Sequence, residues 1–117
     1  MKHILMIAAL CLAGAAQADE PEITKVDAIE IGGKWRFDVT IRHPDTGWEH
    51  YADGWRVLDM NGAELGIRVL LHPHVNEQPF TRSLSGVDIP DGTKQVQIQT
   101  RDVSHGWNEN TTIVDLN

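Results

Sequence analysis

The sequence predicts an all-β domain, a seven-stranded antiparallel β-sandwich of the immunoglobulin or fibronectin type III kind, preceded by an N-terminal signal peptide helix. Three observations favour this fold. Apolar and polar residues alternate over seven short segments. Turn signals separate those segments about every ten residues, as in known sandwiches. Helical periodicity is almost absent after residue 18. A small barrel or a jelly roll is the second choice, since both also use many short strands.

The first 18 residues have the pattern of a secretory signal peptide. An apolar and small-residue run over 4–16 ends in Ala16-Gln17-Ala18, which has the A-x-A form of a cleavage site. The run is shorter than the roughly 20 residues that cross a bilayer, so we expect cleavage and no membrane insertion afterwards. Cys11 is not expected to carry a lipid, because Leu10 stands where a small residue is required. We predict a periplasmic or secreted protein with a single domain over 19–117.

The first two strands are expected at the start of that domain. Residues 23–31 form the first, which Gly32-Gly33 closes. The second is the clearest in the chain, because charged and hydroxyl side chains alternate with four apolar residues that we expect to face the core: Trp35, Phe37, Val39 and Ile41. With no disulfide to staple the sheets, a core tryptophan such as Trp35 or Trp55 is expected to carry the packing.

Five further strands are expected over Gly54–Met60, Glu64–Leu71, Phe80–Val87, Lys94–Val103 and Thr111–Leu116. Trp55 and Val57 should point inward from the first of these. Asn61-Gly62 then marks a two-residue hairpin turn, because both residues accept positive φ at low cost. In the strand after it, one face is expected to hold Leu65, Ile67, Val69 and Leu71. Pro90-Asp91-Gly92 turns the chain into the strand whose inward residues should include Val96 and Ile98.

The order of the connections predicts a polar, histidine-rich end. Consecutive antiparallel strands alternate in direction, so alternate connections emerge at the same end of a sandwich. The three tight turns already named contain no histidine. The long connections, at 42–53, 72–79 and 104–110, contain all five histidines that follow the signal peptide. Long loops on a rigid scaffold commonly carry binding residues.

Metal binding is the sharpest hypothesis for this end. Pro73 holds His72 extended, so the rings of His72 and His74 point to one side about 7 Å apart. Imidazole suits Cu²⁺ and Zn²⁺. We expect ligands from His72, His74 and His105, with His43 or His50 completing the set. Strand parity also allows His43 to be a structural histidine that caps the core, and the alternative hypothesis is that all five histidines are structural.

Asp102 shares the parity of the inward residues of its strand. It could orient a metal-bound imidazole from behind. Alternatively, it is a buried or half-buried carboxylate that holds backbone amides of the loop.

A metal-free recognition surface is the competing hypothesis. We expect five residues to contact an exported protein or a glycan: Trp48, Tyr51, Trp107, Glu77 and Asn76. Alternatively, Trp48 and Trp107 pack over the open end of the sandwich as a lid. Glu77 and Arg82 are more simply explained as a structural ion pair.

Composition and motifs exclude several other classes. Ten Lys and Arg stand against 17 Asp and Glu, and the net charge of −7 disfavours nucleic acid and anionic membranes as partners. Cys11 is the only cysteine, so thiol catalysis and disulfides are not expected in the folded domain. No nucleophile elbow, metalloprotease helix or phosphate loop occurs, so we do not expect an enzyme.

Three stretches also carry a family resemblance: Trp35–Trp48, Tyr51–Trp55 and His72–Leu84. They resemble a family of small exported bacterial proteins without an assigned activity, and the resemblance extends over most of residues 34–107. It implies export and a single β domain. It implies no catalytic residue, so none is carried over.

Overall fold

The structure is a computed structural model that describes residues 20–116, so the predicted signal peptide lies outside the described residues. All regular elements over residues 20–116 are strands. Within that range, accordingly, no helix is present that is long and apolar enough to cross a membrane.

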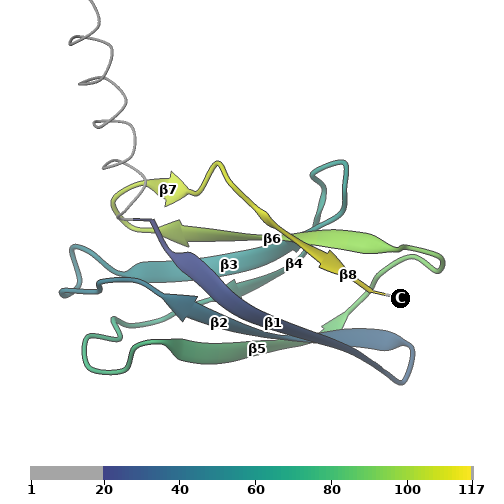
Figure 1. The fold of residues 1–117 in the computed structure, drawn as a ribbon, viewed down its shortest axis with the longest axis horizontal. Helices are drawn as coiled ribbons and strands as arrows, with labels where there is room; N and C mark the ends of the chain where they lie inside the picture. The colour runs from purple at the N-terminus through teal and green to yellow at the C-terminus, as the bar shows by residue number, and fades with distance from the viewer. Residues whose placement is uncertain (1–19, 117) are drawn as a thin grey trace, which may run out of the picture.

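Two antiparallel sheets pack face to face (Figure 1). The smaller sheet has the order β1-β2-β5 and comprises β1 (Glu22–Ile31), β2 (Lys34–Arg42) and β5 (Phe80–Val87). The larger sheet has the order β4-β3-β6-β7, with β8 also paired to β6; its strands are β3 (Ala52–Leu58), β4 (Glu64–Val69), β6 (Gln95–Asp102), β7 (Gly106–Trp107) and β8 (Thr112–Asp115). The predicted all-β sandwich is confirmed. The two-residue β7 was not expected, because the sequence predicted a loop there.

The core lies between the sheets, where the alternating patterns placed it. Phe37, Val39 and Ile41 on β2 are fully buried, and they face Trp55 and Val57 on β3. Val96 and Ile98 on β6 complete this layer. Full burial of each large apolar side chain stabilises the fold by about 1.5–3 kcal/mol. These residues therefore hold the two sheets together without a disulfide.

The prediction for β4 was wrong at its C-terminal end. The strand ends at Val69 instead of Leu71, and Ile67, Val69 and Leu71 are exposed. Leu70, the next residue along the chain, is the buried one, at 3% exposure. Because β4 is an edge strand beside β5, its inward side is crowded: a Cβ at Gly66 would lie 3.0 Å from Leu84 Cδ2. Of the predicted apolar set, Leu65 therefore packs against the core, whereas Ile67, Val69 and Leu71 face solvent.

Candidate functional site

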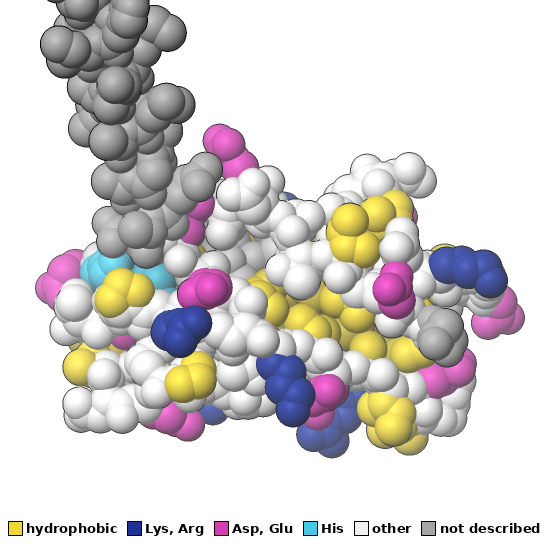
Figure 2. All heavy atoms as spheres, in the orientation of Figure 1, with side chains coloured by type: hydrophobic (Ala, Val, Ile, Leu, Met, Phe, Trp, Pro, Cys, Tyr) yellow, Lys and Arg dark blue, Asp and Glu magenta, His cyan; other side chains and the backbone are white. Residues whose placement is uncertain are grey.

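The three long connections meet at one end of the sandwich, as predicted from chain reversal (Figure 1). We call residues 43–51, 70–79 and 103–105 the loop end. Its rings are neighbours: the centroids of His43 and His50 are 4.7 Å apart, and those of His50 and His105 are 6.4 Å apart. The rings of His72 and His74 lie 4.7 Å apart. The histidine side chains that are visible in Figure 2 (cyan) lie at one end of the face shown.

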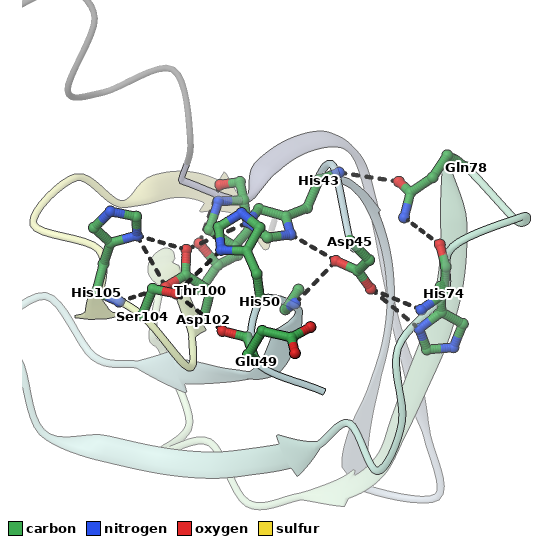
Figure 3. Close-up of polar contacts among 12 residues, drawn as sticks. His43, Asp45, Glu49, His50, His74, Gln78, Thr100, Asp102, Ser104 and His105 are labelled. Carbon is green, nitrogen blue, oxygen red and sulfur yellow. Dashed lines mark hydrogen bonds and ion pairs between the residues drawn. The ribbon is translucent and has the colours of Figure 1, made fainter. Parts of the chain in front are cut away.

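Asp45 is a buried carboxylate that joins two of these connections (Figure 3). Its Oδ1 accepts hydrogen bonds from His43 Nδ1 at 2.6 Å and from the Ala52 amide at 3.0 Å. Its Oδ2 accepts the His74 amide at 2.7 Å. One side chain from the β2–β3 connection thus holds the first residue of β3 and the middle of the β4–β5 connection. A buried carboxylate needs such donors, because an unsatisfied one would be costly.

Asp102 performs the same task at the end of β6. It is fully buried and accepts the His105 amide at 2.6 Å and His105 Nδ1 at 2.9 Å, while His43 Nε2 lies 3.3 Å from its Oδ2. Burial opposes ionisation of this carboxyl, but hydrogen bonds from the side chain and backbone of His105 outweigh it. Together with the charges of His105 and His43, they hold the pKa of Asp102 below its usual value of 3.8. Asp102 is therefore a buried carboxylate that holds one loop amide, that of His105, and the imidazole rings of His105 and His43.

His43 connects the two carboxylates. It is buried beyond the end of β2, and its two ring nitrogens face Asp45 and Asp102 from opposite sides (Figure 3). Its backbone amide donates to Gln78 Oε1 at 3.0 Å, and Gln78 Nε2 donates to the His74 carbonyl at 2.9 Å. We call Asp45, Asp102, His43 and Gln78 the clamp residues. They tie all three connections of the loop end to one another.

His74 is the second buried histidine. Its ring stacks on Phe80 with a centroid separation of 4.0 Å, and its Nε2 lies 2.9 Å from Arg82 Nη2. Its Nδ1 is buried with no hydrogen-bond partner, at 4.0 Å from Asp45 Oδ2. Burial lowers the pKa of His74 below 6.5, and the charges of Arg82 and His72 lower it further, against a smaller opposing effect of Glu77 and Asp45.

The outer surface of the loop end includes four exposed apolar side chains among its polar ones, whereas several of its polar side chains are buried. Trp48 is 67% exposed, Leu71 76% and Val75 52%, and Val103 is also exposed. Every connection contributes at least one of these residues. Tyr51 supports Trp48 edge-on, with ring centroids 5.6 Å apart. Proteins usually bury apolar side chains and expose polar ones. Buried polar groups and exposed large apolar groups are therefore the observations that point to a special role for a surface.

The other predicted contact residues have different surroundings. Trp107 is half-buried on the outer face of the larger sheet, where the guanidinium carbons of Arg56 and Arg101 lie 3.9 and 5.2 Å from its ring centroid. It is therefore neither beside Trp48 nor a lid over the open end. Glu77 and Asn76 are exposed, and Glu77 forms the expected ion pair with Arg82 at 3.2 Å. His72 is exposed as well.

The five histidines do not form a metal-binding group in this geometry. Over the described range 20–116, no set of three or more His, Cys, Asp or Glu side chains is arranged to hold a metal ion. The rings fall into two groups instead: His72 with His74, and His43 with His50 and His105. The predicted Cu or Zn site has no support from this arrangement, and we assign none of the histidines as a ligand.

Sequence reasoning missed the clamping by Asp45 and Gln78. A signal for Asp45 was available: it lies two residues after His43 and four after Ile41, so it shares the inward parity of β2. The signal for Gln78 was not local, because its partners come from the other long connection and from His74.

Comparison with known proteins gives one informative similarity. No protein-family model matches the chain, and no solved structure matches it. The chain is 38% identical over 112 aligned residues to a protein of Halomicrobium mukohataei described as "Putative lipoprotein". The aligned region covers 86% of this chain and 55% of that relative. The chain thus resembles a protein described as a lipoprotein and spans about half of its length.

Proposed function

We propose that this protein is an exported, non-catalytic recognition domain that binds a protein partner through its loop end. The observation that carries the proposal is the exposure of apolar side chains at the loop end, beside polar side chains that are buried there. The first two connections bury the polar side chains of His43, Asp45 and His74, and the third lies beside the buried carboxylate of Asp102 at the end of β6. Each connection has at least one apolar side chain in solvent. Exposed apolar groups gathered on one surface are typical of interaction sites.

The clamp residues support this function because they order the loops before any partner arrives. Loops that become ordered only on binding lose conformational entropy at that step, and pre-ordered loops avoid the loss. Asp45 and Asp102 together accept hydrogen bonds from the first residue of β3 and from all three connections. In this proposal His43 of the clamp is a structural support of the surface, and the surface itself is made by other residues.

The exposed residues favour a protein partner over a glycan. Trp48 is a large amphipathic side chain on a short turn closed by the Gly47–His50 bridge, and tryptophan is enriched among residues that dominate protein binding energy. Leu71, Val75 and Val103 are aliphatic. Aliphatic side chains pack against a partner's apolar surface, whereas sugar sites rely on aromatic rings and hydrogen-bonding groups.

Export is supported from two directions. The first 18 residues carry the pattern of a signal peptide. The relative from Halomicrobium mukohataei is described as a lipoprotein, a class of protein that acts outside the cytoplasm. We therefore place the partner in the periplasm or outside the cell.

Site-directed photo-crosslinking tests the proposal. A photoreactive amino acid is placed at Trp48 and, as a matched control, at Met60, which is 46% exposed in the β3–β4 turn at the other end of the sandwich. Illumination in the exported fraction of the source cells should give a discrete protein adduct from position 48 only. The identified partner is then titrated calorimetrically with wild type, Trp48→Ala and Met60→Ala. Trp48→Ala should raise the Kd by about 30-fold, as for a binding hot spot of about 2 kcal/mol.

Three results would contradict the proposal. Equal adducts from positions 48 and 60 would mean non-specific contact. Equal affinity of wild type and Trp48→Ala would remove the loop end from the interface. Saturable binding to a glycan array that depends on Trp48 would replace the protein partner with a sugar. Calorimetry with Cu²⁺ and Zn²⁺ on the wild type and on a His72→Ala/His74→Ala variant tests the metal alternative directly. If these histidines bind a metal, the wild type should release or absorb heat on titration and the variant should not.

A further inference from the structure

His74 links two connections of the loop end through its backbone. Its amide donates to Asp45 Oδ2 at 2.7 Å, and its carbonyl accepts Gln78 Nε2 at 2.9 Å. Its ring is buried and stacked on Phe80 at an interplanar angle of 10°. His74 thus holds the β4–β5 connection against the β2–β3 connection, beside the hydrogen bond that the His43 amide donates to Gln78 Oε1 at 3.0 Å.

The contact with Arg82 defines which form of His74 fits that place. A guanidinium group has donors and no acceptor, so Arg82 Nη2 at 2.9 Å requires a lone pair on His74 Nε2. The ring must then be neutral, with its proton on Nδ1. Adding a second proton would put it on Nε2. That would replace a hydrogen bond with two donors and two positive charges in contact inside the protein.

The charged neighbours of His74 do not offer a replacement for this bond. Arg82 on β5 and His72 on the same connection oppose a charge on the ring. Glu77 is exposed and already bonded to Arg82 at 3.2 Å. Asp45 Oδ2, 4.0 Å from Nδ1, already accepts the His74 amide, and the other oxygen of Asp45 accepts two more donors. The remaining face of the ring lies on Phe80, which is uncharged.

We propose that the β4–β5 connection is an acid-sensitive latch, held closed while the His74 ring is neutral and opened when that ring takes up a proton. The protonated ring leaves the stack on Phe80 for water, and Arg82 keeps Glu77 as its partner. The bonds of His74 to Asp45 and Gln78 are lost with it. Leu71 and Val75 belong to the same connection, so opening removes them from the binding surface. This functional consequence rests on the proposed function, whereas the latch itself does not.

Hydrogen exchange tests the latch without any partner. Amide exchange of full-length mature protein is followed at about pH 7.5 and about pH 5, with rates corrected for intrinsic chemistry and EDTA present to exclude metal effects. Protection of the His74 amide, which donates to Asp45, should fall by about tenfold or more at the lower pH, while Trp55 and Val57 in the core stay protected. His74→Gln, whose side-chain oxygen can accept Arg82, should lose this response. The matched control His72→Gln, at an exposed neighbouring histidine, should keep it.

A second measurement covers the case in which His74→Gln does not fold. The ring proton of His74 is titrated by NMR in wild type, Arg82→Met and Glu77→Gln. Removing the like charge of Arg82 should move the midpoint to higher pH, and removing the opposite charge of Glu77 should move it to lower pH.

Two results would overturn the latch: equal loss of protection in wild type and His74→Gln, or a midpoint that does not respond to Arg82→Met. If instead the latch operates but partner affinity is the same at both pH values, the latch stands and the proposed use of Leu71 and Val75 in binding fails.

Discussion

Two carboxylates, Asp45 and Asp102, determine the geometry of the loop end. Both are buried, and each accepts donors from more than one segment of the chain. Most ion pairs of this protein are on the surface, where they contribute little to stability. The two buried carboxylates differ because removing the charge of either one leaves buried donors without an acceptor.

Asp102→Asn should be among the more destabilising polar substitutions in the domain. The amide keeps the shape of the side chain but cannot accept from the His105 amide, His105 Nδ1 and His43 together. We expect a loss of about 2–4 kcal/mol in the free energy of unfolding, measured by urea denaturation at neutral pH. Asp27→Asn is the matched control, because Asp27 forms an exposed ion pair with Lys25 at 3.6 Å; it should change stability by about 0.5 kcal/mol or less. Similar losses in both variants would refute the clamp.

Acid should destabilise the domain in two separate steps. The pKa of His74 is lowered from 6.5 in the folded protein, so the unfolded chain binds that proton first and stability falls as the pH drops below 6.5. The pKa values of Asp102 and Asp38 are lowered from 3.8, so the stability they contribute is complete above 3.8 and is lost as the pH falls below it. Hydrogen bonds from Ser83 and Arg36 cause the shift of Asp38.

Urea denaturation across the acid range should resolve the two steps. His74→Gln should abolish the decline that begins near pH 6.5 and leave the lower step in place. His72→Gln should retain both steps. A first step that persists unchanged in His74→Gln would assign it to another group.

At the scale of single elements, β4 shows that the apolar residues of an edge strand can face solvent. Its alternating apolar residues Ile67 and Val69 face solvent, whereas the side toward the core has Gly66, which lies close to Leu84 and Val87 of the neighbouring sheet. An apolar alternation therefore shows only that one face of a strand is apolar. Which face is buried depends on the strand beside it.

Leu70 and Leu71 provide a direct test of this assignment. Leu70 is 3% exposed and Leu71 is 76% exposed, although they are neighbours in the chain. Leu70→Ala should lower the free energy of unfolding by about 2–5 kcal/mol, because it leaves a cavity in the core. Leu71→Ala should change it by about 0.5 kcal/mol or less. Chemical denaturation of both variants measures the difference, and the opposite ranking would contradict the burial of Leu70.

For the whole molecule, His43 couples one sheet to the other. It follows β2 of the smaller sheet and lies between Asp45 of the β2–β3 connection and Asp102 of β6 in the larger sheet. The two clamps are thus one network that crosses the sandwich at the loop end. Networks of this kind stabilise a unique arrangement only when all members are satisfied.

A double-mutant cycle should detect this coupling. Asp45→Asn and Asp102→Asn share His43, so their effects on the free energy of unfolding should differ from additivity by about 0.5–3 kcal/mol. Asp27→Asn combined with Asp102→Asn should be additive, because Asp27 contacts neither clamp residue. Additivity in both cycles would mean that His43 does not transmit the interaction.

The sequence alone determined seven of the eight strands, the positions of the tight turns and the end at which the histidines gather. These features depend on period-two alternation, turn residues and chain reversal, and all three are local or follow from strand order. The sequence also predicted that His43 and Asp102 point inward, because the alternation of inward and outward side chains continues to the ends of their strands. The two-residue turn predicted at Asn61-Gly62 was wrong, because Gly62 has positive φ but Asn61 does not, and residues 59–63 connect β3 to β4.

The tertiary structure alone decided what those polar residues contact. It separated the histidines into two groups and made Asp45 and Asp102 the acceptors that join the loops. It also placed Trp107 beside two arginines and buried Leu70. The reason is physical: hydrogen bonds and ring contacts depend on ångström-scale distances between connections that belong to different sheets. The packing of the two sheets sets those distances, and no local pattern of residues encodes them.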